Sequence, residues 1–451
     1  MLSLIMLASM FLISLAAGLL VPISILCIYN SLRFGVFLIL FLFVTESLFP
    51  NMGAINFGVA IYLQDAIMTL ILFACILRLF FQQGIIANNK YWFLFIVALI
   101  PPLALGVQQF GTLAIVSFRP YFYMLAAVTY PASFRFSIKD FQYILKYLAI
   151  AVVAIVLIVF ARWAIVSIPI TSLMPPEGRY GSPEGSILRV VPSFVAIVIA
   201  QFAMILFFSR GRLSEKIENL RPLTFILFFV VIVLQHRSVW LALLIGVAFA
   251  FLLNRDNQAS SSAKSRMFPV LILLIVTFIL LAVSGKFGGV TDDITSSASR
   301  AIAVSDTTEE RLGSWKALLS MWYHDGVRTW IIGRPFGSDM DRYASDAFGA
   351  RKITYQAHNF FIQTLMTSGL FGVMSIILAY FQTSKILIVD GRAGEYRSEY
   401  HLLYVLLMMQ LIYYIPYGAH YMQGLLFGCF ISFAAQKLKS SDADYKRHLT
   451  F

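Results

Sequence analysis

Charged residues are scarce in this chain. Of its 451 residues only 12% are charged and 60% are hydrophobic, whereas an ordinary soluble domain is about 25% charged. So little charge cannot cover a globular surface in water, which excludes a soluble globular protein. Apolar runs long enough to cross about 30 Å of hydrocarbon recur from Leu4 to Phe433. We therefore expect the lipid bilayer to be the solvent for most of the chain.

Cysteine is also rare. Cys27, Cys75 and Cys429 lie in apolar segments and the longest polar loop has none, so that loop holds neither a disulfide framework nor a cysteine-based zinc site.

The GxSxG, P-loop and HExxH patterns are missing too, and hydrolase and ATPase functions lose support. No basic region or small-residue cleavage site marks the N-terminus as a removable signal peptide. We expect the first apolar segment to stay in the membrane.

The net charge of +12 reports orientation rather than binding of nucleic acid, because Lys and Arg alternate with nearly uncharged segments along the chain. Basic segments are cytoplasmic by the positive-inside rule. They lie at 78–90, 134–140, 210–221, 255–266, 383–397 and from 437 to the C-terminus. The segments between them are predicted to lie outside, at 50–58, 106–112, 169–186, 235–238, 285–357 and 417–420.

This alternation predicts an all-α integral membrane protein with about 12–14 transmembrane helices. The predicted spans are 34–49, 59–81, 91–105, 113–132, 141–168, 187–209, 222–234, 239–254, 267–284, 358–382, 398–416 and 421–437. Residues 3–29 form one long helix or two short ones broken near Pro22, so the side of the N-terminus stays open. The predicted organisation is transmembrane helices over 1–284, a large outer loop over 285–357, transmembrane helices over 358–437 and a cytoplasmic tail over 438–451.

Ionisable residues inside apolar segments are costly and therefore suggest function. Seven such residues are predicted near the outer ends of their helices: Glu46, Asp65, Arg119, Arg162, Arg189, His236 and Arg237. A cation-rich cavity that opens outward would explain this bias, although a helix-end arginine also reaches lipid headgroups without any further role. Arg237 is harder to explain that way, because it follows His236 in a turn too short to be a solvated loop. Its planar guanidinium suits a pyrophosphate.

The large outer loop contains a predicted helix. Thr307 and Glu310 fit a capping box, and Leu312, Trp315, Leu319 and Trp322 follow at helical spacing. We expect this helix to lie on the membrane surface, with Arg311 on the face of Trp315 at the depth of a lipid-linked phosphate or simply of the headgroups.

Two polar stretches follow this helix. The turn 333–337 is rich in glycine and would let the backbone approach a ligand closely. Asp339 and Asp341 have the spacing of a metal-binding pair, although two solvated loop aspartates are commoner.

His358 and Asn359 stand where the outer loop re-enters the membrane, ahead of an apolar helix. The positive end of a helix dipole favours the neutral form of a histidine, which suits a general base. The alternative is that His358 only caps the helix.

Together these motifs resemble the O-antigen ligase and polymerase superfamily of bacterial membrane glycosyltransferases. Residues 234–242 look like its arginine-led helix, with His236 where a serine is usual, and 311–315 look like its Arg-to-Trp loop helix. Residues 333–337 are similar to its glycine turn, and His358-Asn359 followed by 369–372 looks like its His-Asn helix start. The resemblance covers roughly 221–437.

The resemblance implies the fold of lipid-phosphate-dependent (GT-C type) glycosyltransferases in the bacterial inner membrane, with an active site facing the periplasm. It implies transfer of a glycan from undecaprenyl pyrophosphate to a sugar hydroxyl, with no metal or other cofactor. On this basis Arg237 and Arg311 bind the pyrophosphate and His358 takes the proton of the acceptor. Arg119, Arg189, Arg162, His236 and Asn359 would contact substrate.

Three functions stay open. A polymerase would join lipid-linked repeat units of an O-antigen, capsule or exopolysaccharide, with a chain-length regulator as an additional partner. A ligase would move the finished glycan to lipid A core. A flippase would need polar residues in both leaflets, and the bias toward the outer ends of the helices counts against it. The polymerase is slightly favoured.

Overall fold

The computed structural model describes the chain in eleven stretches. These are residues 20–49, 55–56, 60–82, 89–134, 137–166, 190–209, 212–253, 306–346, 349–353, 357–392 and 397–448. The predicted span 267–284 and Arg189 lie outside them, as do the side chains of Thr307 and Glu310.

The described residues form a helical bundle with two short hairpins, β1 (Ile55–Asn56) with β2 (Ala60–Ile61) and β3 (Arg342–Asp346) with β4 (Gly349–Ile353). The helices are α2 (Leu32–Leu48), α3 (Leu63–Gln82), α4 (Lys90–Phe110), α5 (Thr112–Ala132), α6 (Ile138–Val166), α7 (Ser193–Phe208), the 3₁₀ helix Arg212–Leu220, α8 (Leu223–Val233), α9 (Arg237–Leu253), α12 (Asp306–His324), α13 (Val327–Ile332), α14 (Phe360–Arg392), α15 (Arg397–Tyr414) and α16 (Tyr421–His448). The predicted all-α class is confirmed.

Several of these helices are long and apolar enough to cross a membrane. Within the described ranges five meet that test, namely α3, α4, α5, α6 and α14. A sixth candidate is the helix Leu20–Asn30 together with α2, although the two are bent by 112°. Of the shorter apolar helices, α7 packs against α6, and α8 and α9 pack against α7. The chain is therefore a multi-pass membrane protein.

Every predicted span that lies in the described residues overlaps a helix. The ends differ in several places: α3 begins at Leu63, after strand β2, α4 continues to Phe110, and α7 begins only at Ser193. Helix α14 continues to Arg392 and α16 to His448, although both were expected to leave the membrane near 382 and 437. Loss of hydrophobicity marks where a segment leaves the lipid, but a helix can continue into water.

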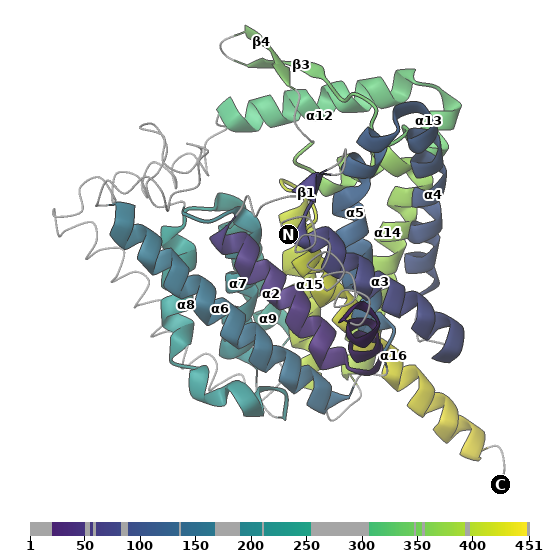
Figure 1. Cartoon of the computed structure of the whole chain (residues 1–451). Coiled ribbons are helices and arrows are strands. Elements are labelled where there is room, and N and C mark those ends of the chain that lie inside the picture. The colour runs from purple at the N-terminus through teal and green to yellow at the C-terminus, as the bar shows by residue number, and fades with distance from the viewer. Residues whose placement is uncertain are drawn as a thin grey trace, which may run out of the picture.

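One end of the bundle is covered by α12, which lies across the ends of α4, α5 and α14, with the β3–β4 hairpin beyond it (Figure 1). We call this the α12 end. Leu318 of α12 packs with Ala357 and Met366 in a small buried cluster, which places α12 against the start of α14. Arg342, which begins β3, donates from Nε to Ser314 Oγ of α12 at 2.7 Å and so joins the hairpin to the helix.

The glycine turn 333–337 packs against the protein's own backbone. Gly333 (φ +81°) lies against a break in α14 at Gly369 (φ +64°), and a Cβ on either residue would come within 2.5 Å of backbone atoms of the other segment. The Arg334 amide donates to Met366 O at 2.7 Å. In this geometry the glycines let the outer segment dock into the broken helix.

Candidate active site

Most of the ionisable residues predicted near helix ends contact other segments of the chain. Arg162 of α6 is buried, and its guanidinium donates to the backbone oxygens of Val190 at 2.8 Å, Ser47 at 2.7 Å and Leu48 at 3.1 Å. These bonds join the end of α2 to the segment before α7. We therefore assign Arg162 to holding the fold rather than to the substrate.

Arg119 of α5 is engaged in a similar way. Its Nε lies 2.9 Å from Asp65 Oδ1 of α3, and its Nη2 donates to Ala60 O at 2.7 Å. The same Asp65 oxygen accepts the Tyr123 hydroxyl at 2.7 Å. Because Asp65 balances its charge, Arg119 is a weak candidate for binding an anion.

Glu46 takes part in a cluster with two residues that the sequence analysis did not single out. Its Oε2 accepts the Tyr421 hydroxyl at 2.6 Å and lies 3.2 Å from His420 Nε2. The His420 ring stacks on Phe194 at 3.9 Å between centroids, and its Nδ1 accepts the Met422 amide at 3.3 Å. Since both imidazole nitrogens have protein partners, His420 holds the short connection between α15 and α16 in place.

The turn between α8 and α9 carries Arg237 at the first position of α9, where its side chain is half-buried. Gln235 has φ +55°, and His236 is buried with Nε2 at 2.9 Å from Val191 O. His236 thus ties the turn to the segment before α7 and is not placed to meet a substrate. The tight turn and this contact fix the helix start that presents Arg237.

The start of α14 carries the exposed His358, which has φ +46°. The helix cap comes from the next residue, because Asn359 Oδ1 accepts the Ile362 amide at 3.0 Å and Asn359 itself is buried. The Phe360 amide donates to Tyr417 O at 3.0 Å. Capping therefore falls to Asn359, and the side chain of His358 is left at the surface of the α12 end.

Helix α12 brings Arg311 to the same place. Its guanidinium carbon lies 5.4 Å from the centre of the Tyr417 ring, a cation–π contact. One turn further on, Trp315 Nε1 donates to Ala357 O at 2.8 Å, directly before His358. Tyr417 therefore touches both the arginine of α12 and the start of α14.

A contact chain links this region to the helix that carries Arg237. The Tyr417 ring stacks on Tyr413 at 5.0 Å, and the Tyr413 hydroxyl lies 2.9 Å from Ser193 Oγ, two residues after the Val191 carbonyl that His236 contacts. The signal that could have found these tyrosines is the run 413–421, rich in tyrosine and histidine but free of charge. A search of the sequence for charged residues in apolar segments does not identify this run.

Unusual backbone conformations occur at two places in the candidate site, the turn before Arg237 and the start of α14. Among the described residues, Gln235 and His358 are those other than glycine with positive φ, and one precedes Arg237 while the other is the candidate base. Such conformations are rare outside glycine and tend to occur at functional sites. Asp339 and Asp341, whose spacing suggested a metal-binding pair, interact in a local turn. In this turn Asp339 Oδ1 accepts the Asp341 amide at 2.8 Å.

Fold and site together define the class: a multi-pass membrane protein with Arg311 close to the start of α14, where His358 is exposed, and with Arg237 at the start of α9. Residues 222–377 match the family model described as O-antigen ligase. The match covers about a third of the chain and supports the resemblance to the O-antigen ligase and polymerase superfamily. The chain matches no curated protein. The matched region contains Arg237, Arg311 and His358.

The match supports a membrane glycosyltransferase-like role in the assembly of O-antigen or a related polysaccharide. An O-antigen ligase family implies a lipid-linked glycan and an acceptor as substrates.

Proposed function

We propose that the chain is an inner-membrane polymerase that transfers a growing glycan from undecaprenyl pyrophosphate to a sugar hydroxyl of the next lipid-linked repeat unit. The observation that carries this proposal is the contact of Tyr417 with both Arg311 and the start of α14, which brings a cation close to the helix start where His358 is exposed. A cation next to a potential base is what displacement of a pyrophosphate by a hydroxyl requires.

The roles follow from the charge that develops during transfer. Arg237 and Arg311 bind the pyrophosphate and neutralise it as the bond between glycan and phosphate breaks. His358 accepts the proton of the attacking hydroxyl. The pyrophosphate leaves with the electrons of the broken bond, and the proton on His358 returns to water afterwards. No step in this sequence calls for a metal or another cofactor.

The sidedness of the site is part of the proposal. The basic segments after α14 and at the end of α16 favour the cytoplasm, which puts the α12 end in the periplasm. Reporter fusions after residues 395 and 440 should therefore give a cytoplasmic signal, and fusions within 290–350 a periplasmic one. A cytoplasmic signal from the 290–350 fusions would contradict both the topology and the proposed site.

An O-antigen ligase is the second candidate, because donor and chemistry are shared and only the acceptor differs. Deletion of the gene distinguishes the two. If single-repeat lipid-linked units accumulate, the protein polymerises, and a chain-length regulator becomes a candidate partner. If long polymer accumulates without being attached to lipid A core, it is a ligase.

The contact between α12 and the start of α14 gives a prediction of its own. Trp315→Phe keeps an aromatic side chain but removes the hydrogen bond to Ala357 O, and one neutral hydrogen bond is worth about 1 kcal/mol. We expect the rate of glycan transfer to fall about fivefold, because Arg311 is held less firmly. The measurement is turnover in membranes at matched protein level.

Trp330→Phe is the matched control. Trp330 Nε1 donates to Tyr323 O within the same outer segment rather than to the start of α14. It should leave turnover within twofold of the parent, a margin that corresponds to about 0.4 kcal/mol. Equal losses in both variants would show that the outer segment had merely been destabilised.

A further inference from the structure

A small pocket lies between α5, the start of α14 and the connection from α15 to α16, with a volume of about 30 Å³. Phe360, whose amide donates to Tyr417 O at 3.0 Å, forms one wall, and Gly418, the residue after Tyr417, forms another. His358 lies two residues before Phe360. The pocket therefore begins close to the residue proposed as the base.

The pocket is lined mostly by apolar groups, and its open polar group is the side-chain amide of Gln363. Gln363 is buried, with 9% of its surface exposed. A Cβ on Gly418 would lie 3.7 Å from Gln363 Oε1, which places this oxygen beside the wall that Gly418 forms. No residue that the structure describes makes a hydrogen bond with this amide. The other polar lining residue is Tyr121, whose hydroxyl lies 2.8 Å from Thr367 Oγ1.

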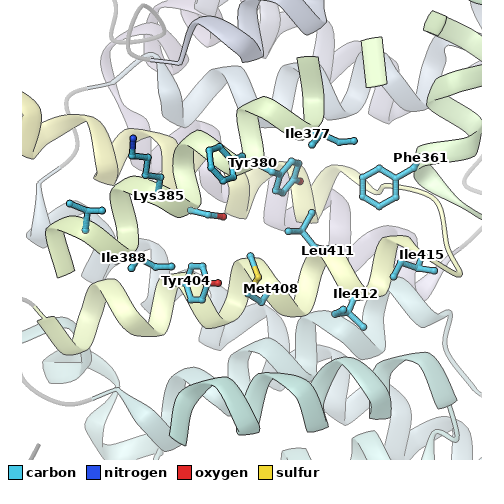
Figure 2. A pocket seen from close by; sticks show the side chains of 13 residues that line it. Phe361, Ile377, Tyr380, Lys385, Ile388, Tyr404, Met408, Leu411, Ile412 and Ile415 are labelled. Atoms are coloured by element: carbon cyan, nitrogen blue, oxygen red, sulfur yellow. The ribbon is translucent and has the colours of Figure 1, made fainter. Parts of the chain in front are cut away.

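A second cavity borders the start of α14, an open apolar groove of about 710 Å³ between α14 and α15 (Figure 2). Phe361 and Ile415 form the end of this groove that is closest in sequence to His358, and they offer a sugar no hydrogen-bonding side chain. Phe361 and Gln363 are about 200° apart around the helix, so groove and pocket lie on opposite faces of α14. Only the pocket offers a polar group close to the base.

The size and polarity of the pocket limit what it can bind. It has room for about two water-sized groups, at roughly 10–15 Å³ each. A sugar hydroxyl or hydroxymethyl group is that small, whereas an acetamido group is larger. A hydroxyl both donates and accepts, so it can pair with either polar atom of the Gln363 amide. Buried side-chain amides almost always have a hydrogen-bond partner, and here the partner can enter from the pocket.

We propose that Gln363 binds a hydroxyl of the acceptor sugar, other than the one that attacks, and so determines which acceptor is used. The inference rests on the proposed function, and it adds a residue that orients the acceptor toward His358. A site built to pair with a substrate hydroxyl rejects an analogue without it, because the buried amide is then left unpaired.

The test compares acceptors that differ by one hydroxyl. The probes are the lipid-linked repeat unit that accumulates when the gene is deleted and synthetic copies of it, each with one sugar hydroxyl replaced by hydrogen. With the parent protein, one such deoxy acceptor should show a kcat/KM about tenfold lower than the complete acceptor. Gln363→Leu should lower kcat/KM of the complete acceptor by about the same factor, and the same deoxy acceptor should lose nothing further, since both changes remove one interaction.

Gly418→Ala is a second variant that keeps the amide. Its methyl group would lie 3.7 Å from Gln363 Oε1, an ordinary contact, so it narrows the pocket without displacing that oxygen. It should lower kcat/KM of the complete acceptor more than that of the deoxy acceptor.

Gln201→Leu is the matched control. Gln201 of α7 is also buried, but its amide donates to Leu406 O at 3.2 Å and it does not line the pocket. This variant should change kcat/KM of the complete and deoxy acceptors by the same factor. Retention of a labelled donor should be unchanged in all three variants, because the donor binds through the arginines.

The other outcomes overturn the inference. Parental kcat/KM for the complete acceptor in Gln363→Leu would mean that the amide pairs only with water. Equal losses with every acceptor in Gln363→Leu would mean that the glutamine merely supports the fold. If the parent protein extended neither the complete acceptor nor any deoxy acceptor, the proposed function itself would fail, a result separate from either of these.

Discussion

Replacing Arg237 by lysine is expected to lower the rate of glycan transfer about 10²- to 10³-fold, nearly as much as replacing it by alanine. Arg237 opens α9 from a turn held by the left-handed Gln235 and by the contact of His236 with Val191. At that fixed position a guanidinium can place two parallel N–H donors on a phosphate, whereas an ammonium supplies a point charge without that geometry. The measurement is turnover of a lipid-linked donor in membranes with matched protein levels.

Arg33→Ala is the control for general charge effects. Arg33 lies at the opposite end of α2 from Glu46, pairs with Asp140 at 3.4 Å and is 41% exposed. Exposed pairs contribute about 0–1 kcal/mol, so turnover should stay within a few-fold of the parent. Full activity in Arg237→Lys would show that Arg237 acts as a positive charge only, and full activity in Arg237→Ala would remove it from the mechanism.

The helices were predictable because the bilayer leaves little choice. A backbone in hydrocarbon must satisfy its own hydrogen bonds, so an apolar run of sufficient length forms a helix. The turn at 235–238 was predictable for the same reason, since His236 and Arg237 interrupt one apolar stretch. The extensions of α14 and α16 were not, because hydropathy reports the medium around a helix and not where the helix ends.

The site was predictable only for residues whose cost in lipid makes them conspicuous. Arg237, Arg311 and His358 were found from charge and position, but so were Arg119 and Arg162, which bind Asp65 and backbone carbonyls instead. The sequence shows that a cation lies in an apolar segment, but it does not show which atoms balance its charge.

The neutral residues of the site were missed for a related reason. Tyr417 carries no charge, and its partners on α12 and α14 are distant in sequence. The pair of Glu46 with His420 joins residues 374 positions apart. Contacts of this kind are products of the tertiary fold, and no local pattern encodes them.

Replacing His358 by alanine is expected to lower turnover about 10²- to 10⁴-fold, the usual loss when a general base is removed. The protein should still insert and still bind the polyprenyl pyrophosphate, because Arg237 and Arg311 remain. The structure makes this test sharper than the sequence could. Capping falls to Asn359, whose Oδ1 accepts the Ile362 amide, so the activity of His358 variants is not confounded by loss of the cap. The measurements are turnover and retention of a labelled donor.

His358→Asn separates chemistry from conformation. His358 has φ +46°, and asparagine adopts that left-handed conformation more readily than most residues. The asparagine variant should therefore keep the local backbone while lacking the basic nitrogen. Asn359→Ala does the opposite, since it removes the cap at a cost of about 1 kcal/mol and leaves the histidine in place. If His358 is the base, His358→Asn is nearly inactive with donor binding intact, and Asn359→Ala loses activity only in proportion to its lower stability. An active His358→Asn would instead assign the strained position a purely structural role, and the proton would have to leave the acceptor by another route.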